Sequence, residues 1–370
     1  MNLPVAAWRE AKSAAFDLPT NSTARGTVRV DFWGDVRDVY ANANLSVYSA
    51  QRCNARCPFC VEELRPASRG GDLALQRRVE PDDGIWFDRL ERVLAVVQRE
   101  LRPSVSVTGG EPSKDPRLPR VLRTLDARSA RKRTVTSNGS GLLDVREGQR
   151  VVDWIAATGV AHLNVSRAHP DQEVNARLMG YADGPTHGAM GAIVSAARAG
   201  GTRVRLSCVL LDGAIDGVDG VARYLDFARS LGVDSVIFRR LMLTDPSTVQ
   251  RNHVVRFSDR RRVALDPLFR RLGDDPRFAF VRQIVGYYYY VEVWRSDGVD
   301  VVFEEADLAR LEDVKRSAPR LVHELVFHPD GSLASTWQPW DGVLGPGRRH
   351  VSPPEPPAQT PAPGAGITGE

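Results

Sequence analysis

From Ala43 to Pro246 the chain alternates short apolar runs with longer amphipathic stretches. The apolar runs have the length of strands, and the stretches between them carry apolar residues at helical spacing. Parallel neighbours in a sheet need helical crossovers, so this alternation predicts βα units around a parallel sheet. Six strands are expected, at 43–50, 104–110, 133–139, 161–168, 203–213 and 234–242; helices are expected between them at 86–101, 118–130, 150–158, 187–199 and 218–231.

The same pattern divides the 370 residues into four parts. Residues 1–42 are irregular and are expected to form an N-terminal extension, and 43–245 form the α/β domain. In 246–345 we expect a basic helical connector followed by two β-hairpins, because Asp297-Gly298 and Asp330-Gly331 supply the positive φ that tight turns need. Residues 346–370 are rich in Pro, Gly and Ala and are expected to be disordered.

Charge and hydropathy narrow the class of protein. The net charge is +4, from 50 Lys and Arg against 46 Asp and Glu, and the basic clusters at 128–133 and 260–262 are short. We interpret them as solvated helix faces rather than a nucleic-acid interface. No apolar run approaches the ~18 residues of a membrane helix. The N-terminal segment lacks the pattern of a signal peptide, so we expect a cytoplasmic protein with no membrane partner.

Three of the four cysteines lie within eight residues, as Cys53-x3-Cys57-x2-Cys60. A secreted disulfide scaffold would spread its cysteines along the chain, whereas a clustered set predicts metal or iron–sulfur ligation. A zinc site would need a fourth ligand, and no Cys or His pair stands nearby at zinc-like spacing. Three thiolates on a cubane leave one iron open for another ligand. Cys208 stands alone in an apolar strand and is interpreted as a core residue.

This spacing, with Phe59 before the last cysteine, resembles the signature of the radical S-adenosylmethionine (SAM) superfamily. Within it the chain most resembles the branch of molybdenum-cofactor and peptide-modifying enzymes. The resemblance covers about 45–245. Together with the hairpins it implies an α/β fold: a partial (β/α)6 barrel of parallel strands with a C-terminal β-hairpin extension. It also implies one [4Fe–4S] cluster per chain, on Cys53, Cys57 and Cys60, with SAM on the open iron.

Polar motifs at the ends of later strands extend the resemblance to the SAM site. Gly109-Gly110-Glu111-Pro112 is similar to the family's cradle for the methionine end of SAM, in which Glu111 would accept from the ammonium group. Thr136-Ser137-Asn138 resembles the next motif, and Ser166-Arg167 would meet the SAM carboxylate. Ser207 stands where relatives often carry an asparagine for the ribose, so the sequence departs from the family at that contact.

The C-terminal part separates the possible functions. Many relatives continue with a hairpin whose following cysteine binds a further cluster, but no cysteine follows Cys208 here, so one cluster is expected. The leading hypothesis is hydrogen abstraction from a small molecule of bacterial natural-product biosynthesis (a sugar, nucleoside or amino-acid derivative), with electrons from a flavodoxin- or ferredoxin-type reductant. The alternatives are modification of a precursor peptide and a non-catalytic electron-transfer protein. The run Tyr287–Tyr290 is interpreted as sheet packing, with a substrate wall as its alternative.

Overall fold

The computed structural model describes residues 26–64, 78–244, 249, 251–286 and 288–345. Within them one sheet has twelve strands, and its eight middle strands, from β13 to β15, are parallel to one another. In spatial order the strands are β11 (Ala279–Val285), β12 (Tyr289–Ser296), β13 (Val299–Ala306), β10 (Ser235–Arg240), β9 (Arg203–Leu210), β8 (His162–Ser166), β5 (Arg133–Ser137), β4 (Ser104–Thr108), β3 (Asn44–Tyr48), β15 (Leu325–Phe327), β16 (Leu333–Ala334) and β17 (Val343–Gly345).

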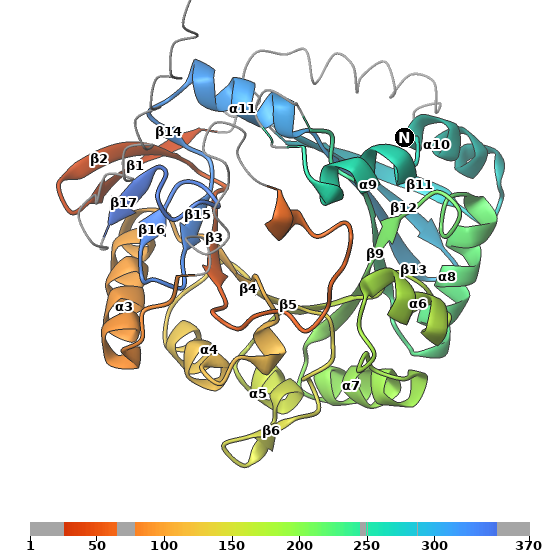
Figure 1. Cartoon of the computed structure of the whole chain (residues 1–370), viewed down its shortest axis with the longest axis horizontal. Coiled ribbons are helices and arrows are strands. Elements are labelled where there is room, and N and C mark those ends of the chain that lie inside the picture. The colour runs from red at the N-terminus through yellow and green to blue at the C-terminus, as the bar shows by residue number, and fades with distance from the viewer. Residues whose placement is uncertain (1–25, 65–77, 245–248, 250, 287, 346–370) are drawn as a thin grey trace, which may run out of the picture.

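All six predicted strands are confirmed, as β3, β4, β5, β8, β9 and β10, and so are the five predicted helices. These helices are α3 (Asp83–Glu100), α4 (Leu118–Asp126), α5 (Val151–Ala157), α7 (His187–Ala199) and α8 (Val218–Ser230). Figure 1 shows the strands curving round a central space while these helices cover the outside of the sheet. The prediction of a partial barrel of parallel βα units is therefore confirmed.

The two faces of the barrel sheet have opposite chemistry. Val107 on β4, Val135 on β5 and Leu206 on β9 are buried in one hydrophobic core with helix residues such as Leu122 and Ile155. The residues that alternate with them face the inside of the barrel and are polar and only half-buried: Ser104, Ser106, Thr134, Thr136, His162, Asn164, Ser166, Arg205 and Ser207. Closed parallel barrels usually fill their interior with branched apolar residues. This interior is instead polar and reached by solvent.

The predicted C-terminal hairpins are present, but they belong to the barrel sheet. Asp297 (φ 44°) and Gly298 (φ 80°) form the turn between β12 and β13, and β13 pairs in parallel with β10. The second hairpin, β15–β16, pairs through β15 with β3. Between them lies α11 (Leu308–Ser317). The C-terminal part thus extends both edges of the predicted six-stranded sheet.

One expectation about an irregular segment needs correction, whereas the expected basic helical connector is present. Residues 27–40, expected to be irregular, form a β-hairpin of β1 (Thr27–Phe32) and β2 (Asp35–Tyr40), to which β14 (Leu321–Val322) adds a third strand. Its turn uses Trp33 and Gly34, both with positive φ. The basic connector is two helices, α9 (His253–Arg261) and α10 (Leu265–Asp274). The tail 346–370 lies outside the described residues.

The tyrosine run is only partly described, since Tyr287 lies outside the described residues. Tyr290 is buried on the outer side of the sheet, and its hydroxyl donates to Oε1 of the buried Glu292 at 3.0 Å. Trp294 Nε1 donates to the other oxygen of the same carboxylate at 3.0 Å. Sheet packing therefore accounts for Tyr290, and its hydroxyl forms a buried hydrogen bond.

Cys208 is fully buried in the core on β9, as predicted, and burial raises the pKa of its thiol. Cys208→Ala is therefore expected to retain the cluster's visible absorbance. Cys208→Ser should be the less stable variant, by about 1–3 kcal/mol, because it places a hydroxyl in an apolar face. Iron content and denaturant unfolding of both variants test this. Loss of iron from the alanine variant would contradict the core assignment.

In the described part of the chain, no helix is both long and apolar enough to cross a membrane.

Candidate active site

The three clustered cysteines occupy the loop that follows β3, at the carboxyl ends of the strands. All three are half-buried, and none of them forms a disulfide bond with another described residue. Burial raises the pKa of Cys57, and the nearby Cys60 and Cys53 raise it further, so both of these cysteines lie within electrostatic reach of Cys57. The Cys60 N–H donates to Cys57 O at 3.1 Å and closes the turn between these two residues. The fold therefore brings the three predicted ligands together.

A helix absent from the predicted set supports this cysteine loop. It is α6 (Gln172–Met179), which begins at Asp171, whose side chain accepts from Val174 N–H, and ends at Gly180 with φ 62°. The carbonyl oxygen of Met179 accepts from the Arg56 N–H at 3.0 Å and lies 3.4 Å from Cys57 Sγ. A Cβ on Gly180 would lie 2.8 Å from Arg56 O, so only glycine allows this close contact. Asp171 and Gly180 were the sequence signals that could have revealed α6.

Phe59 packs its ring on the same support. It contacts the small hydrophobic cluster of Ala168, Met179 and Tyr181. On its other side its ring lies 6.1 Å from that of Phe257 on α9. The aromatic residue before the last cysteine therefore joins the cysteine loop to both α6 and α9.

The glycine turn after β4 is in close contact with the residues that lead into the cysteine loop. A Cβ on Gly110 (φ 47°) would lie 1.9 Å from Gln51 O, and one on Gly109 (φ 79°) would lie 2.6 Å from the ring of Tyr48. The Gly110 N–H donates to Glu62 Oε1 at 2.9 Å. Close packing and positive φ thus both require glycine at these two positions. This packing places the expected SAM cradle beside the cysteines.

Glu111 lies at the centre of a buried hydrogen-bond network and is 1% exposed. Its Oε1 accepts from Ser113 N–H (2.9 Å), Ser113 Oγ (2.6 Å) and Ser137 Oγ (2.6 Å), and its Oε2 accepts from Asn138 N–H (2.6 Å). The carboxylate therefore joins the turn after β4 to the turn after β5. Its direct contact with the SAM ammonium stays a prediction, while its role in holding the two turns together is visible in these bonds.

Asn138 carries this network to the cysteine loop. Its Nδ2 donates to Asn54 Oδ1 at 2.8 Å and lies 3.6 Å from Cys53 Sγ. Thr136, two residues earlier, faces the barrel interior, where its Oγ1 accepts from Asn164 Nδ2 at 3.4 Å. In the motif Thr136-Ser137-Asn138, the first side chain thus faces the barrel interior, the second binds Glu111 and the third binds the cysteine loop.

Ser166 and Ser207 are paired neighbours on β8 and β9 and both face the interior. Arg167 does not. It is 2% exposed and donates to three backbone carbonyls, those of His169 (3.0 Å), Pro185 (3.1 Å) and Pro170 (2.8 Å). Its guanidinium also lies 4.8 Å above the ring of Phe227, and burial lowers its pKa. These contacts hold the segment that leads into α6, and contact with the SAM carboxylate stays a prediction.

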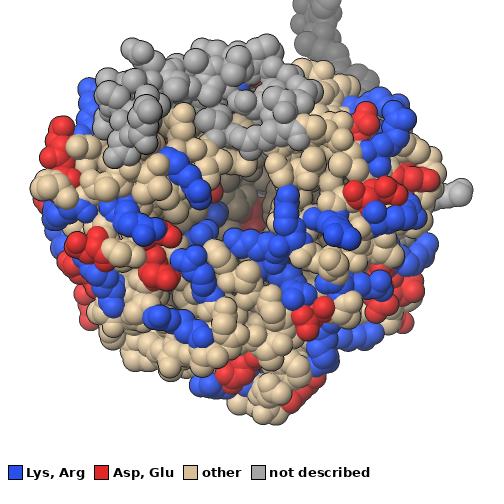
Figure 2. All heavy atoms as spheres, turned by 180° about the vertical axis from the view of Figure 1, so that it is seen from behind, with Lys and Arg blue, Asp and Glu red and all other residues tan. Residues whose placement is uncertain are grey.

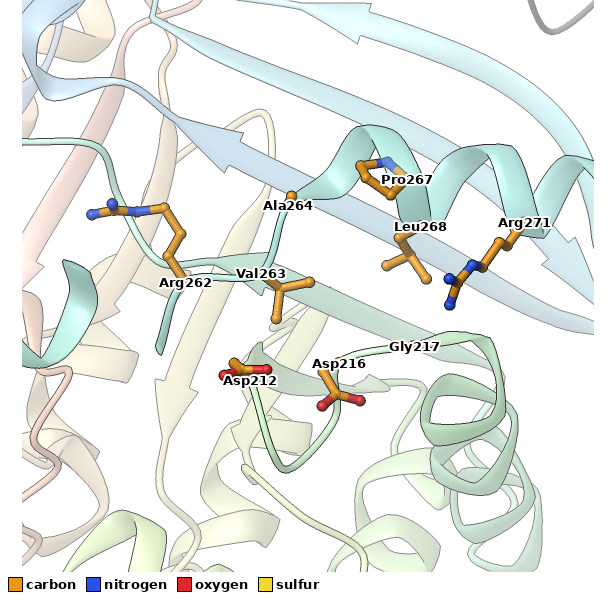
Figure 3. Close-up of a pocket in the computed structure, with 9 residues that line it drawn as sticks. All are labelled: Asp212, Asp216, Gly217, Arg262, Val263, Ala264, Pro267, Leu268 and Arg271. Carbon is orange, nitrogen blue, oxygen red and sulfur yellow. The ribbon is translucent and has the colours of Figure 1, made fainter. Parts of the chain in front are cut away.

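A separate pocket of about 410 Å³ lies beyond the end of β9, between the loop 212–217 and the junction of α9 with α10. Figure 3 shows Asp212 and Asp216 on one side and Arg262, Pro267, Leu268 and Arg271 on the other. None of the cysteines and none of the glycine turn lines it. It is distinct from the expected cluster and SAM site.

Comparison with known proteins agrees with this geometry. Residues 47–225 match the family model described as the radical SAM superfamily. These residues therefore form a radical SAM domain, the domain of the radical SAM class of enzymes. Its curated relatives include GTP 3',8-cyclase 1 of Mycobacterium tuberculosis, 26% identical over 54% of this chain and 50% of the relative. Another is GTP 3',8-cyclase of Pseudomonas putida, 28% identical over 59% of each chain.

This chain therefore spans about half the length of the first of these relatives. Among solved structures, Streptococcus suis SuiB is similar with a TM-score of 0.45 and 14% identity, over 80% of this chain and 60% of that one.

The superfamily uses a [4Fe–4S] cluster and SAM, and the residues of this loop fit that cluster. Across the described residues, no group of three or more His, Cys, Asp or Glu side chains converges as it would on one metal ion. In a cubane, however, each thiolate binds a different iron, so the ligands surround the cluster instead of meeting at one point. Cys53, Cys57 and Cys60 would hold three irons, and the Asn138 amide beside Cys53 Sγ could donate to a ligand sulfur.

Proposed function

We propose that this protein cleaves SAM reductively and uses the resulting radical to abstract hydrogen from a small molecule held inside the barrel. When bound, the reduced cluster supplies the electron that breaks the sulfonium C–S bond of SAM, giving methionine and a 5′-deoxyadenosyl radical. That radical takes a hydrogen atom from a substrate C–H bond to give 5′-deoxyadenosine. The polar, solvent-reached inner face of the barrel is the observation that carries the proposal.

The chain's own residues would bind and orient the reactants. The turn Gly109-Gly110 lies against the segment that leads into the cysteine loop, and the methionine end of SAM would bind beside it. Ser166 and Ser207, side by side on the interior face, are available to the carboxylate and ribose hydroxyls. Toward the amino ends of the same strands, the half-buried polar side chains of the inner face would hold a polar substrate and limit its access to bulk water.

The substrate we propose is a sugar, nucleoside or amino-acid derivative of a bacterial natural-product pathway. The named relatives act on GTP, which is a nucleotide, and this supports a small polar substrate over a protein. An acidic flavodoxin or ferredoxin in the cytoplasm would supply electrons. Arg52 and Arg56, which are exposed beside the cysteines, are suited to meet such a partner.

A precursor peptide is the second candidate, and one observation favours it. Strand β11 forms one edge of the large sheet, and Val281 on it is 48% exposed. An extended peptide could add to this edge by backbone hydrogen bonds. The peptide would then have to enter the barrel from that side.

The test is product formation by anaerobically reconstituted, chemically reduced protein. We expect slow release of 5′-deoxyadenosine and methionine in equal amounts without substrate, and faster release with the correct substrate. Chromatography of both products measures this, and deuterium transfer from a labelled substrate into 5′-deoxyadenosine identifies the hydrogen donor. If cluster-loaded protein bound no SAM and released neither product, the protein would instead be an electron carrier.

A further inference from the structure

We propose that Lys132 and Arg205 form a binding site, inside the barrel, for the anionic phosphate or carboxylate group of the substrate. This inference deepens the proposed function and rests on it, since it names the chemical class of the molecule that the barrel holds. The residues lie toward the amino ends of the parallel strands, away from the cysteine loop.

The first argument is placement. Lys132 immediately precedes β5, and Arg205 is the third residue of β9, on the interior face. Arg205 lies in register with Asn164 on β8, and its Nε donates to Ser235 Oγ on β10 at 3.0 Å. The Asn164 Oδ1 is buried and accepts no hydrogen bond. Figure 2, the view from behind, shows a hollow with Lys and Arg side chains along its border and some Asp or Glu atoms deeper inside it.

The second argument is charge. Their cationic neighbours have carboxylate partners: Arg203 pairs with Asp234 (3.5 Å) and Asp300 (3.8 Å), and Arg239 pairs with Glu304 (3.5 Å). Neither Lys132 nor Arg205 forms an ion pair with any described residue of the chain. Both are only partly exposed. Two half-buried cations without carboxylate partners are costly to the folded protein, and an anionic ligand would offset that cost.

The protonation equilibria agree with this crowding of positive charge. Burial, followed by the charges of Arg205 and Arg203, lowers the pKa of Lys132. Burial and then the charges of Arg239 and Arg203 lower the pKa of Arg205, although Glu304 and Asp300 act in the opposite direction. Burial, Lys132 and Arg205 lower the pKa of His162 to about 4, so this ring is neutral at pH 7 and can serve as a hydrogen-bond partner.

The third argument is length. From Arg205 to the end of β9 at Leu210 the strand rises by roughly 17 Å. A molecule with its anionic group at Arg205 and its reactive carbon near the cysteine loop must span a comparable distance. This length favours an extended anionic molecule over a single inorganic ion. Ser207, one interior position above Arg205, would contact the middle of such a molecule.

The experiment measures binding of two probes, inorganic pyrophosphate and citrate, to the purified full chain by calorimetry at constant ionic strength. We expect Arg205→Gln and Lys132→Gln each to weaken binding of the preferred probe about tenfold or more. Arg205→Lys should retain most of the affinity. Arg99→Gln, on the exposed end of α3 where its partner is Glu100, is the matched loss of charge and should bind like the wild type.

A second readout separates binding from folding. Lys132→Gln should leave the melting temperature of the ligand-free protein unchanged or raise it, because Lys132 forms no ion pair with any described residue. Arg205→Gln also loses the hydrogen bond to Ser235, so for that variant a lower melting temperature would not count against the site. The preferred probe should raise the melting temperature of the wild type but not that of Arg205→Gln. Preference for pyrophosphate assigns a phosphate group and preference for citrate a carboxylate.

The inference is overturned if the wild type binds neither probe, or if Arg205→Gln and Lys132→Gln bind as tightly as Arg99→Gln. Should Arg205→Gln fail to fold, Lys132→Gln decides alone. Because these titrations need no SAM turnover, they fail independently of the proposed function. A protein that releases 5′-deoxyadenosine but ignores both probes would refute only this site.

Discussion

Replacing Cys53, Cys57 and Cys60 together with alanine is expected to reduce the iron content of reconstituted protein from about four atoms per chain to background. The three thiols share one loop, in which Cys53 and Cys60 lie within electrostatic reach of Cys57, and Cys208 is buried elsewhere in the core. These are the four cysteines of the sequence, so no further thiol could take the place of the three ligands. Release of 5′-deoxyadenosine should fall to the level of a protein-free control.

Iron and sulfide analysis with visible absorbance measures this effect, and Cys208→Ala is the control for the loss of a cysteine. Single replacements are expected to lower iron content less completely than the triple replacement. A wild-type count near eight irons would contradict the single-cluster expectation. If the triple variant kept the visible absorbance, the cysteine loop would not be the binding site of the cluster.

Glu111→Ala is expected to have the second largest effect, on both stability and SAM binding. The carboxylate accepts four buried hydrogen bonds, from Ser113, Ser137 and Asn138, and its loss leaves these donors without their acceptor. We expect the free energy of unfolding to fall by about 3 kcal/mol or more. SAM affinity should fall about ten- to a hundredfold, because the turns after β4 and β5 would no longer be held together.

Denaturant unfolding and SAM titration of cluster-loaded protein test the two parts separately. Glu100→Ala, an exposed carboxylate on α3, is the matched control and should change neither quantity. Glu111→Gln keeps the shape but presents an amide NH₂ to hydrogen-bond donors, so it should be intermediate. Unfolding of Glu111→Ala at the wild-type midpoint would contradict the structural role, and unchanged SAM affinity would contradict the cradle.

The sequence predicted the barrel well because its signal is local. Each of the six predicted strands has five to eight residues with buried apolar positions and ends near a polar motif, and alternation with helices leaves few arrangements other than a parallel sheet. The hairpin at 27–40 was missed although Thr27–Phe32 alternates polar and apolar residues, because Asp35–Tyr40 breaks that alternation and the turn, Trp33-Gly34, is not an Asp-Gly pair. Its pairing with β14 depends on a segment far along the chain.

The candidate site also has features that the sequence predicts and features that only the folded structure shows. The residue types and spacing identified the cysteines and the glycine turn, because only a few side chains can perform those roles. The same sequence could not show that Arg167 donates to three carbonyls or that Glu111 lies at the centre of a network, since both depend on loops that meet only in the folded chain. Lys132 and Arg205 were missed because a cation without a partner is recognised only when its surroundings are known.

The pairing of β15 with β3 bears on how the protein is made. Leu325 pairs with Leu45, so one side of β3 has no neighbour until the ribosome has synthesised nearly all of the residues between them. Such a pairing is slow to form and leaves a hydrophobic strand edge exposed during synthesis. The cysteine loop directly follows β3, so it is accessible over the same interval. Cluster assembly machinery could therefore reach these thiols on the nascent chain before the last strands cover that side of the barrel.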